Sequence, residues 1–104
     1  MKVNFKTTFK DPMGKTVMDG KKDFLVSDRV ATILFNLSRI HDKPMTAEEK
    51  YQAYKLCTRI TMNPSEVELD KEESDFIKEA CADALSSGAY GQVVDIIDNK
   101  IKSE

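Results

Sequence analysis

The stretch that decides the fold is SDRVATILFNLSRI, which runs from Ser27 to Ile40. Four of its apolar residues recur at the spacing i, i+3, i+4, i+7: Val30, Ile33, Leu34 and Leu37. This spacing stacks side chains on one face of an α-helix, and Ala31 and Phe35 broaden that face. Ser27 is the expected N-cap, because its hydroxyl can accept a hydrogen bond from a free amide of the first turn. The stretch therefore predicts a helix from Ser27 to about Ile40, placed centrally in the core.

A second helix follows after a break at His41-Asp42-Lys43-Pro44. These residues end the first helix, because the residue before a proline is pushed out of the α region. Thr46 and Glu49 then have the spacing of a capping box, in which each side chain satisfies the other residue's free backbone amide. The pattern predicts a helix over residues 47–62. Its apolar stripe is Ala53, Leu56, Cys57 and Ile60.

Two more helices are predicted in the last third of the chain. Asp70 and Glu73 repeat the capping pattern with a carboxylate as the cap. The apolar stripe that follows is Phe76, Ile77, Ala80, Cys81, Ala84 and Leu85. Ser86-Ser87-Gly88 predicts the end of this helix, with Gly88 in the C′ position. A fourth helix is expected from about Ala89 to Lys102, with Val93, Val94, Ile97 and Ile101 on one face.

The N-terminal segment has a different period. In residues 1–10, Val3, Phe5, Thr7 and Phe9 share one parity and the lysines share the other. A period of two is typical of a strand with one wet face. Asp11-Pro12-Met13-Gly14 contains the residues that a β-turn uses, so we expect Lys15–Met18 to pair back as a hairpin.

Two short segments stay open between alternatives. Asp19-Gly20 is a second turn signal, after which Asp23–Val26 is either a third short strand or a lead-in to the first helix. The lead-in is favoured. Glu66–Leu69 alternates charged and apolar residues and is either one short strand or an extended link.

The composition is that of one folded domain. Of the 104 residues 40% are apolar, and 16 basic against 18 acidic side chains give a net charge of −2, which excludes a disordered chain. The fold class expected is α+β and mainly helical, with an N-terminal β-hairpin packed on three or four helices. We predict a single domain over 1–104, with the β-hairpin element in 1–26 and the helical part in 27–104.

The sequence gives no sign of a membrane segment or a secretory signal. No run approaches the roughly 18 apolar residues that a membrane-spanning helix needs. The N-terminus lacks a basic region followed by an apolar stretch and a cleavage site. We expect a cytoplasmic protein with no membrane contact.

Residues that could carry chemistry are few. The one imidazole, His41, is expected at the end of the first helix, where it would interact well with the helix dipole. Cys57 and Cys81 lie inside apolar stripes and are expected to be reduced core thiols. No acidic cluster has the spacing of an EF-hand, and Gly88-Ala89-Tyr90-Gly91 is interpreted as a helix end and turn rather than a backbone clamp. We predict no catalytic residue, no cofactor and no metal.

The charge distribution suggests a contact surface. Residues 1–26 contain six lysines against three aspartates, and the lysines form the candidate surface: Lys2, Lys6, Lys10, Lys15, Lys21 and Lys22. An open strand edge in this element could also add a strand from a partner. The acidic segment Glu66–Asp75 is either a solvated face or a functional one.

The order of signals resembles small accessory proteins of tailed bacteriophages and prophages. The stretches that carry the resemblance are DGKK at 19–22, AEEKYQAYKL at 47–56, VELDKEE at 67–73 leading to Ile77-Lys78, and GQVVDII at 91–97. The resemblance implies a small binding protein that acts on a viral or host protein. It implies no activity, cofactor or catalytic residue.

These patterns together favour a non-enzymatic protein-binding or regulatory accessory module. The alternative is a nucleic-acid-associated accessory protein that uses the basic N-terminal hairpin. The two differ in salt dependence, because counterion release makes affinity for nucleic acid fall steeply with salt. The sequence leaves open whether the protein is a monomer or a homodimer.

Overall fold

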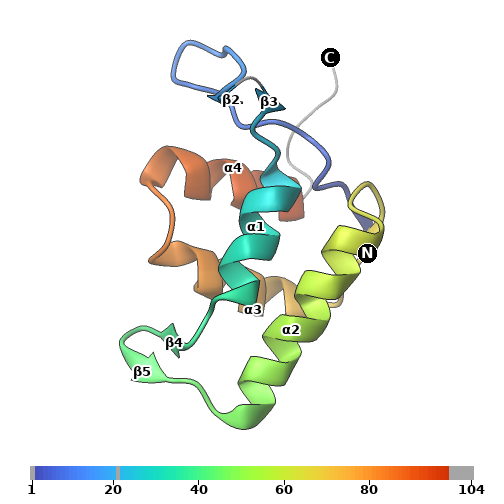
Figure 1. Ribbon diagram of the computed structural model, residues 1–104, viewed down its shortest axis with the longest axis vertical. Coiled ribbons are helices and arrows are strands. Elements are labelled where there is room, and N and C mark those ends of the chain that lie inside the picture. Colours follow the sequence, from blue (N-terminus) through green and yellow to red (C-terminus); the bar gives the residue numbers. More distant parts are fainter. Residues whose placement is uncertain (1, 21, 99–104) are drawn as a thin grey trace.

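The computed structural model describes residues 2–20 and 22–98, and in them four amphipathic segments fold as helices (Figure 1). The helices are α1 (Val26–Phe35), α2 (Ala47–Met62), α3 (Lys71–Ala82) and α4 (Ser87–Ile97). Six short strands form three antiparallel pairs: β1 (Lys2–Val3) with β6 (Val67–Glu68), β2 (Met18–Asp19) with β3 (Lys22–Asp23), and β4 (Arg39–Ile40) with β5 (Lys43–Pro44). The expected α+β, mainly helical class with an N-terminal hairpin is confirmed.

Helix α1 is central, as its apolar spacing predicts. It runs antiparallel to α2, with α3 and α4 behind it in Figure 1, and it packs against α2 and α3. Val30 and Leu34 are fully buried. Helix α3 in turn packs against α4, so the helices share one core with Phe5, Leu56 and Ile77.

The N-terminus of α1 differs from the expectation. Its N-cap is Leu25, and no side chain caps the helix, so the prediction that Ser27 is the cap is wrong. Instead the Val26 amide donates to the Thr7 carbonyl at 2.8 Å, and the Ser27 amide donates to the Phe5 carbonyl at 3.0 Å. Carbonyls from the N-terminal segment thus satisfy amides that a side chain was expected to satisfy.

Helix α1 also ends earlier than expected. Its last residue is Phe35 rather than Ile40, and the chain then forms the hairpin β4–β5 around His41 and Asp42. Both turn residues have positive φ, at 52° and 63°, as a type I′ turn requires. Phe35 is 67% exposed, so the prediction that it broadens the core face is wrong. It lies about 100° around the helix from Leu34, beyond the edge of the buried stripe.

Helices α2 and α3 begin where their capping residues predict. The Glu49 amide donates to the Thr46 hydroxyl at 3.1 Å, and the Thr46 amide donates to the Glu49 carboxylate at 2.9 Å. Asp70 and Glu73 make the same reciprocal pair at 2.8 and 3.0 Å. The predicted range 47–62 for α2 is confirmed, and its stripe is buried.

The junction of α3 and α4 is the next correction. Helix α3 ends at Ala82, and Ser86 is the N-cap of α4, with its hydroxyl accepting from the Ala89 amide at 3.4 Å. Gly88 therefore lies in the first turn of α4 rather than at the end of α3. The pair Gly88 and Gly91 sits within this helix, not in a turn as interpreted. The predicted continuation of α4 to Lys102, with Ile101 on its face, lies outside the described residues.

The N-terminal segment is not one continuous strand. Only Lys2–Val3 is a strand, and it pairs with Val67–Glu68, so the segment 66–69 contains a short strand. The Thr7 amide donates to the Phe5 carbonyl at 2.9 Å, a tight turn that breaks the strand at Lys6. The predicted parity of burial is still confirmed, because Val3, Phe5 and Phe9 are all buried.

The rest of the N-terminal region folds as an arm, which we define as residues 8–25 without residue 21. The predicted turn is confirmed, since the Gly14 amide donates to the Asp11 carbonyl at 2.9 Å. Behind it, the Val17 amide donates to the Phe9 carbonyl at 2.9 Å, so the segment does pair back. Asp23 belongs to β3 and Leu25 forms a bridge with Thr8. The favoured interpretation of 23–26 as only a lead-in is thus wrong for these two residues.

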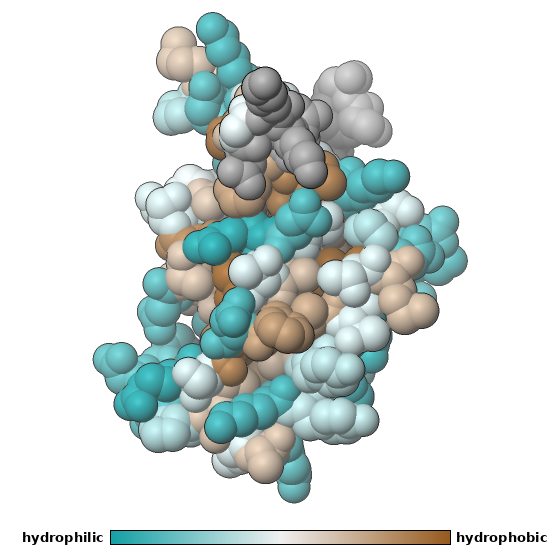
Figure 2. All heavy atoms as spheres, in the orientation of Figure 1, coloured by the Kyte–Doolittle hydropathy of each residue, from teal (hydrophilic) through white to brown (hydrophobic). Residues whose placement is uncertain are grey.

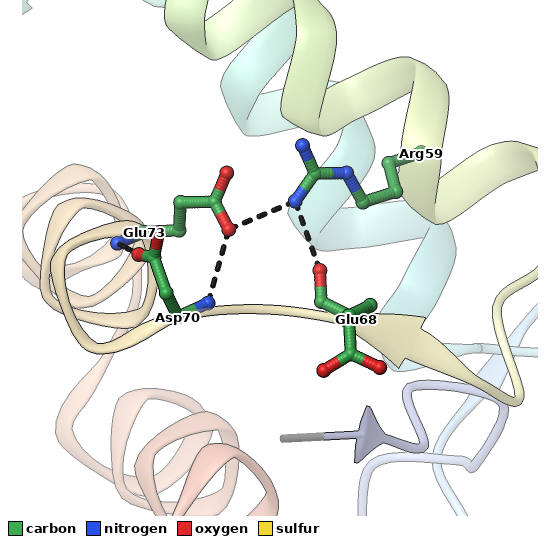
Figure 3. Close-up of polar contacts among 4 residues, drawn as sticks. All are labelled: Arg59, Glu68, Asp70 and Glu73. Atoms are coloured by element: carbon green, nitrogen blue, oxygen red, sulfur yellow. Dashed lines mark hydrogen bonds and ion pairs between the residues drawn. The ribbon is translucent and has the colours of Figure 1, made fainter.

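A polar latch joins α2, β6 and α3 (Figure 3). The Arg59 guanidinium donates to the Glu68 carbonyl at 2.8 Å and to the Glu73 carboxylate at 2.9 Å. The same carboxylate accepts from the Asp70 amide at 3.0 Å. Burial opposes ionisation of Glu73, but the bonds from Arg59 and Asp70 outweigh it and lower the pKa of Glu73. The latch therefore fixes the start of α3 against the end of α2.

Candidate functional site

The residues considered for catalysis lie on different elements of the fold. His41 is in the turn between β4 and β5, and its Nδ1 lies 3.8 Å from an Asp83 carboxylate oxygen. This corrects its expected place at the end of the first helix. Cys57 and Cys81 are buried free thiols, as expected, and burial raises the pKa of Cys81 to about 12. Within residues 2–20 and 22–98, no group of three or more His, Cys, Asp or Glu side chains could hold a metal ion.

The lysines proposed as a contact surface lie on different elements where the structure describes them. Lys2 lies on β1, where its amino group is 3.7 Å from Glu66, whereas Lys10 and Lys15 lie on the arm beyond the break at Lys6. In Figure 1 the N-terminus lies beside α2, and β2 and β3 lie at the top of the molecule. Lys6 and Lys15 are exposed. Lys21 lies outside the described residues, and of Lys22 only the backbone is described, in β3.

A hollow of about 450 Å³ lies between the arm and the first turns of α4. Its apolar lining comes from both elements and from the residue before the α4 cap: Phe9, Pro12, Val17, Phe24, Leu85 and Ala89. Its polar lining includes Lys10, Arg29 and Gln92. The volume falls in the range of about 300–1,000 Å³ that is typical of binding pockets.

A second hollow of about 360 Å³, which Arg29 also lines, lies between α1 with the residues that follow it and Ala84, just after α3. Its lining includes Thr32, Ile33, Leu37, Arg39 and Ala84. Because Arg29 lines both hollows, they adjoin along its side chain. We call the two together the α1–α4 groove.

The arm side of the groove is held by directed contacts. The Gln92 side chain pairs with the main chain of Lys10 on both sides: it accepts from the Lys10 amide at 2.7 Å and donates to the Lys10 carbonyl at 2.9 Å. The ring centroids of Phe9 and Phe24 lie 5.2 Å apart with the rings tilted by 44°, within the distance range of aromatic pairs. The Phe9 amide also donates to the Phe24 carbonyl at 3.2 Å. The arm is thus fixed to α4 and the hollow is formed in advance of any ligand.

The charged residues that line the groove are all basic. Its lining holds three basic residues, Lys10, Arg29 and Arg39, and no acidic residue in the part of the chain that the structure describes. Of the acids next to these residues in sequence, Asp11 accepts from the Met13 and Lys15 amides and Asp83 pairs with His41. Asp28, which precedes Arg29 in the first turn of α1, is exposed and lines neither hollow. A partner with negative charge would therefore meet no opposing carboxylate among the lining residues.

Arg29 is the central feature of the groove. Its side chain is half-buried, and its one hydrogen bond to a described residue is a long one of 3.4 Å to the Ala84 carbonyl. It forms no ion pair with any carboxylate of residues 2–20 and 22–98. Arg59 and Lys78, by contrast, are each paired with a carboxylate, at 2.9 and 2.6 Å. A half-buried guanidinium has donors in a fixed fork that fits a carboxylate.

Sequence analysis found one residue of the groove and missed the others. Lys10 belongs to the proposed lysine surface, whereas Arg29, Arg39 and Gln92 carried no signal. Arg29 and Asn36 do lie at i and i+7 on the edge of the core stripe, with Ile33 of that stripe at i+4 between them. That spacing could have marked a second face of α1, but not what lies opposite it.

Apolar side chains also reach the surface elsewhere. Figure 2 shows them in the middle of one face of the molecule, with hydrophilic residues projecting around its outline. On α2, Tyr51 and Tyr54 are exposed with ring centroids 6.2 Å apart, and the Lys55 amino group lies 5.0 Å from the Tyr51 centroid. Neither tyrosine lines either of the two hollows.

Comparison with protein-family models, with curated proteins and with solved structures gave no match. Among the described residues, no helix combines the length and the apolar character needed to cross a membrane. The geometry of the chain itself therefore carries the functional argument.

Proposed function

We propose that this protein is a non-enzymatic protein-binding module of the cytoplasm and that it binds its partner in the α1–α4 groove. The observation that carries the proposal is the groove itself. Its two hollows have apolar walls, its charged lining residues are all basic, and the Gln92 side chain holds the arm against α4. A preformed surface of this kind supports binding, because little conformational entropy is lost when a partner docks. The phage-like order of the sequence signals favours a viral or host protein as that partner.

The nucleic-acid alternative has less support. A phosphate backbone needs several cations along one track, and the lysines of residues 2–15 are divided by the break in the strand. Phe5 and Phe9 are buried, so they are not free to stack on bases. The groove offers three cations but mainly apolar walls, which suit side chains of a protein better than a solvated backbone.

The test is a pulldown with a tagged full chain from bacterial lysate treated with nuclease, comparing wild type with two tryptophan variants. Gly88 lines the larger hollow, and a Cβ at this position would meet nothing within 4 Å. Gly91 lies one turn further along α4, has equal space and does not line either hollow. Gly88→Trp should abolish capture of the partner, and Gly91→Trp should not. Equal capture by both variants, or loss of all partners with nuclease, would refute the proposal.

A further inference from the structure

We propose that the groove binds an acidic segment of the partner in which one carboxylate lies between two apolar anchor side chains. This inference rests on the proposed function, because it names the chemistry of the partner that the groove would bind. Three features of the groove lead to it: the position of Arg29, the two hollows beside it, and the sign of the rim.

The carboxylate is set by Arg29. Arg29 lines both hollows, and the single weak hydrogen bond from its guanidinium to the Ala84 carbonyl leaves most of its five N–H donors unused by described residues. A carboxylate can take two of these donors at once, and such paired bonds are roughly twice as strong as neutral ones. Partial burial strengthens the attraction further, because water screens it less.

The apolar anchors are set by the hollows. On the α4 side, Phe9, Phe24 and Leu85 offer walls for a bulky side chain. On the other side, Ile33 and Leu37 line a smaller space. A chain that places its carboxylate on Arg29 therefore has an apolar site on either side, and the larger anchor belongs in the α4 hollow.

The rim selects the overall charge of the segment. Lys10 lines the larger hollow and Arg39 lines the smaller one, and neither forms an ion pair with a described carboxylate. The Lys10 amino group donates to the Thr8 and Thr16 hydroxyls, and the Arg39 guanidinium donates to the Asp42 carbonyl. Both cations attract further acidic residues outside the anchors. A basic or neutral segment with the same apolar anchors gains nothing from this rim and would leave Arg29 without a counter-charge.

The experiment uses a display library of random 12-residue peptides selected on the immobilised full chain. We expect the enriched peptides to carry Asp or Glu between two large apolar residues. Synthetic copies should lose affinity by about tenfold or more when that acid is changed to its amide, because a charge-assisted pair is lost. Arg29→Gln should cause a similar loss for the parent peptide and almost none for the amide peptide.

Matched glycine variants separate this inference from the proposed function. Gly88→Glu places a negative charge in the larger hollow and should weaken the acidic peptide at least tenfold, whereas Gly88→Lys and Gly91→Glu should change its affinity less than about threefold. Enrichment of basic or uncharged apolar peptides that Gly88→Trp still blocks would overturn the acidic segment and leave the groove as a binding site. Peptides indifferent to Gly88→Trp would overturn both.

The same protein variants also test two other possible occupants of the groove: a second copy of the chain and a single-stranded nucleic acid. A wild-type chain that sedimentation shows as a dimer, and that Gly88→Trp converts to a monomer, would place a second copy in the groove and overturn the inference. A labelled single-stranded oligonucleotide that binds wild type but not Arg29→Gln would do the same. An unchanged monomer mass and no oligonucleotide binding are the expected results.

Discussion

Two partly buried arginines on neighbouring helices differ in what surrounds them. Arg59 on α2 is closed off by the Glu73 carboxylate and the Glu68 carbonyl, both within 2.9 Å. Arg29 on α1 has one weak bond and faces two hollows. This contrast indicates where function lies. An arginine paired with a carboxylate stabilises the fold, whereas a half-buried arginine without an ion pair to a described carboxylate is available to a partner. The experiments below test that division, starting with the largest effect.

The first test compares the core with the groove wall. Ile77→Ala on α3 removes a fully buried side chain and should lower the free energy of unfolding by about 2–5 kcal/mol. Leu34→Ala on α1 should cost as much, since Leu34 is buried equally well. Leu85 is only partly buried, so Leu85→Ala should cost about 1–2 kcal/mol. Urea unfolding measures all three, and a Leu85→Ala cost equal to that of Ile77→Ala would make the groove wall part of the core.

The second test compares the two arginines directly. Arg59→Ala leaves the Glu73 carboxylate and the Glu68 carbonyl without their donor and should cost about 1–3 kcal/mol. Arg29→Ala removes one long hydrogen bond and should cost at most about 1 kcal/mol. Denaturant midpoints of the two variants decide the matter. If Arg29→Ala lowers stability more than Arg59→Ala does, the Arg29 guanidinium stabilises the fold. It would then not be available to bind a partner, which contradicts the proposal.

The third test compares helix caps on the two sides of the molecule. Asp70→Ala breaks a reciprocal capping box and should cost about 1 kcal/mol. Ser86 caps α4 through one bond of 3.4 Å, so Ser86→Ala should cost less, about 0.5 kcal/mol. Thermal unfolding of both variants gives the comparison. A reversed order would show that the start of α4, beside the groove, is held more firmly than its hydrogen bonds indicate.

The smallest effect is the pH dependence of the latch. The folded-state pKa of Glu73 is lowered, so its contribution to stability is complete above its ordinary value of 4.5 and is lost as pH falls through the folded-state value. Glu73→Gln should therefore be less stable than wild type at pH 7, and the gap should narrow as the pH falls below 4.5. Urea unfolding at pH 7 and pH 3 measures the gap. A gap that widens towards low pH contradicts the latch.

The success of the sequence analysis depended on how local each signal was. Thr46 with Glu49 and Asp70 with Glu73 act within one turn, so the starts of α2 and α3 were predicted from the residues alone. Gly88 failed as a helix end because Ser86, two residues earlier, was a stronger N-cap for the next helix. Local signals thus compete, and the spacing of one motif does not show which prevails.

The candidate site was less predictable than the fold. Lysines are easily counted along a chain, but the tight turn at Lys6, in which the Thr7 amide donates to the Phe5 carbonyl at 2.9 Å, divides them. Gln92 lies 82 positions from Lys10 and still fixes its main chain. No periodic pattern in the sequence predicts a contact between two residues that are so far apart in the chain.

By itself the sequence determined that four helices form, that Thr46 and Asp70 cap two of them, and that the chain turns at residues 11–14, because caps, side-chain periodicity and turn residues act over a few neighbouring positions. It placed most of the buried residues, but not Phe35 or Ala84, which are exposed, or Ile96, which is buried. Only the tertiary structure decided that the carbonyls of Phe5 and Thr7 begin α1, that β1 pairs with β6, and that Arg29 stands between two hollows. Each of these depends on segments that are far apart in the chain and meet only when the apolar stripes are buried together.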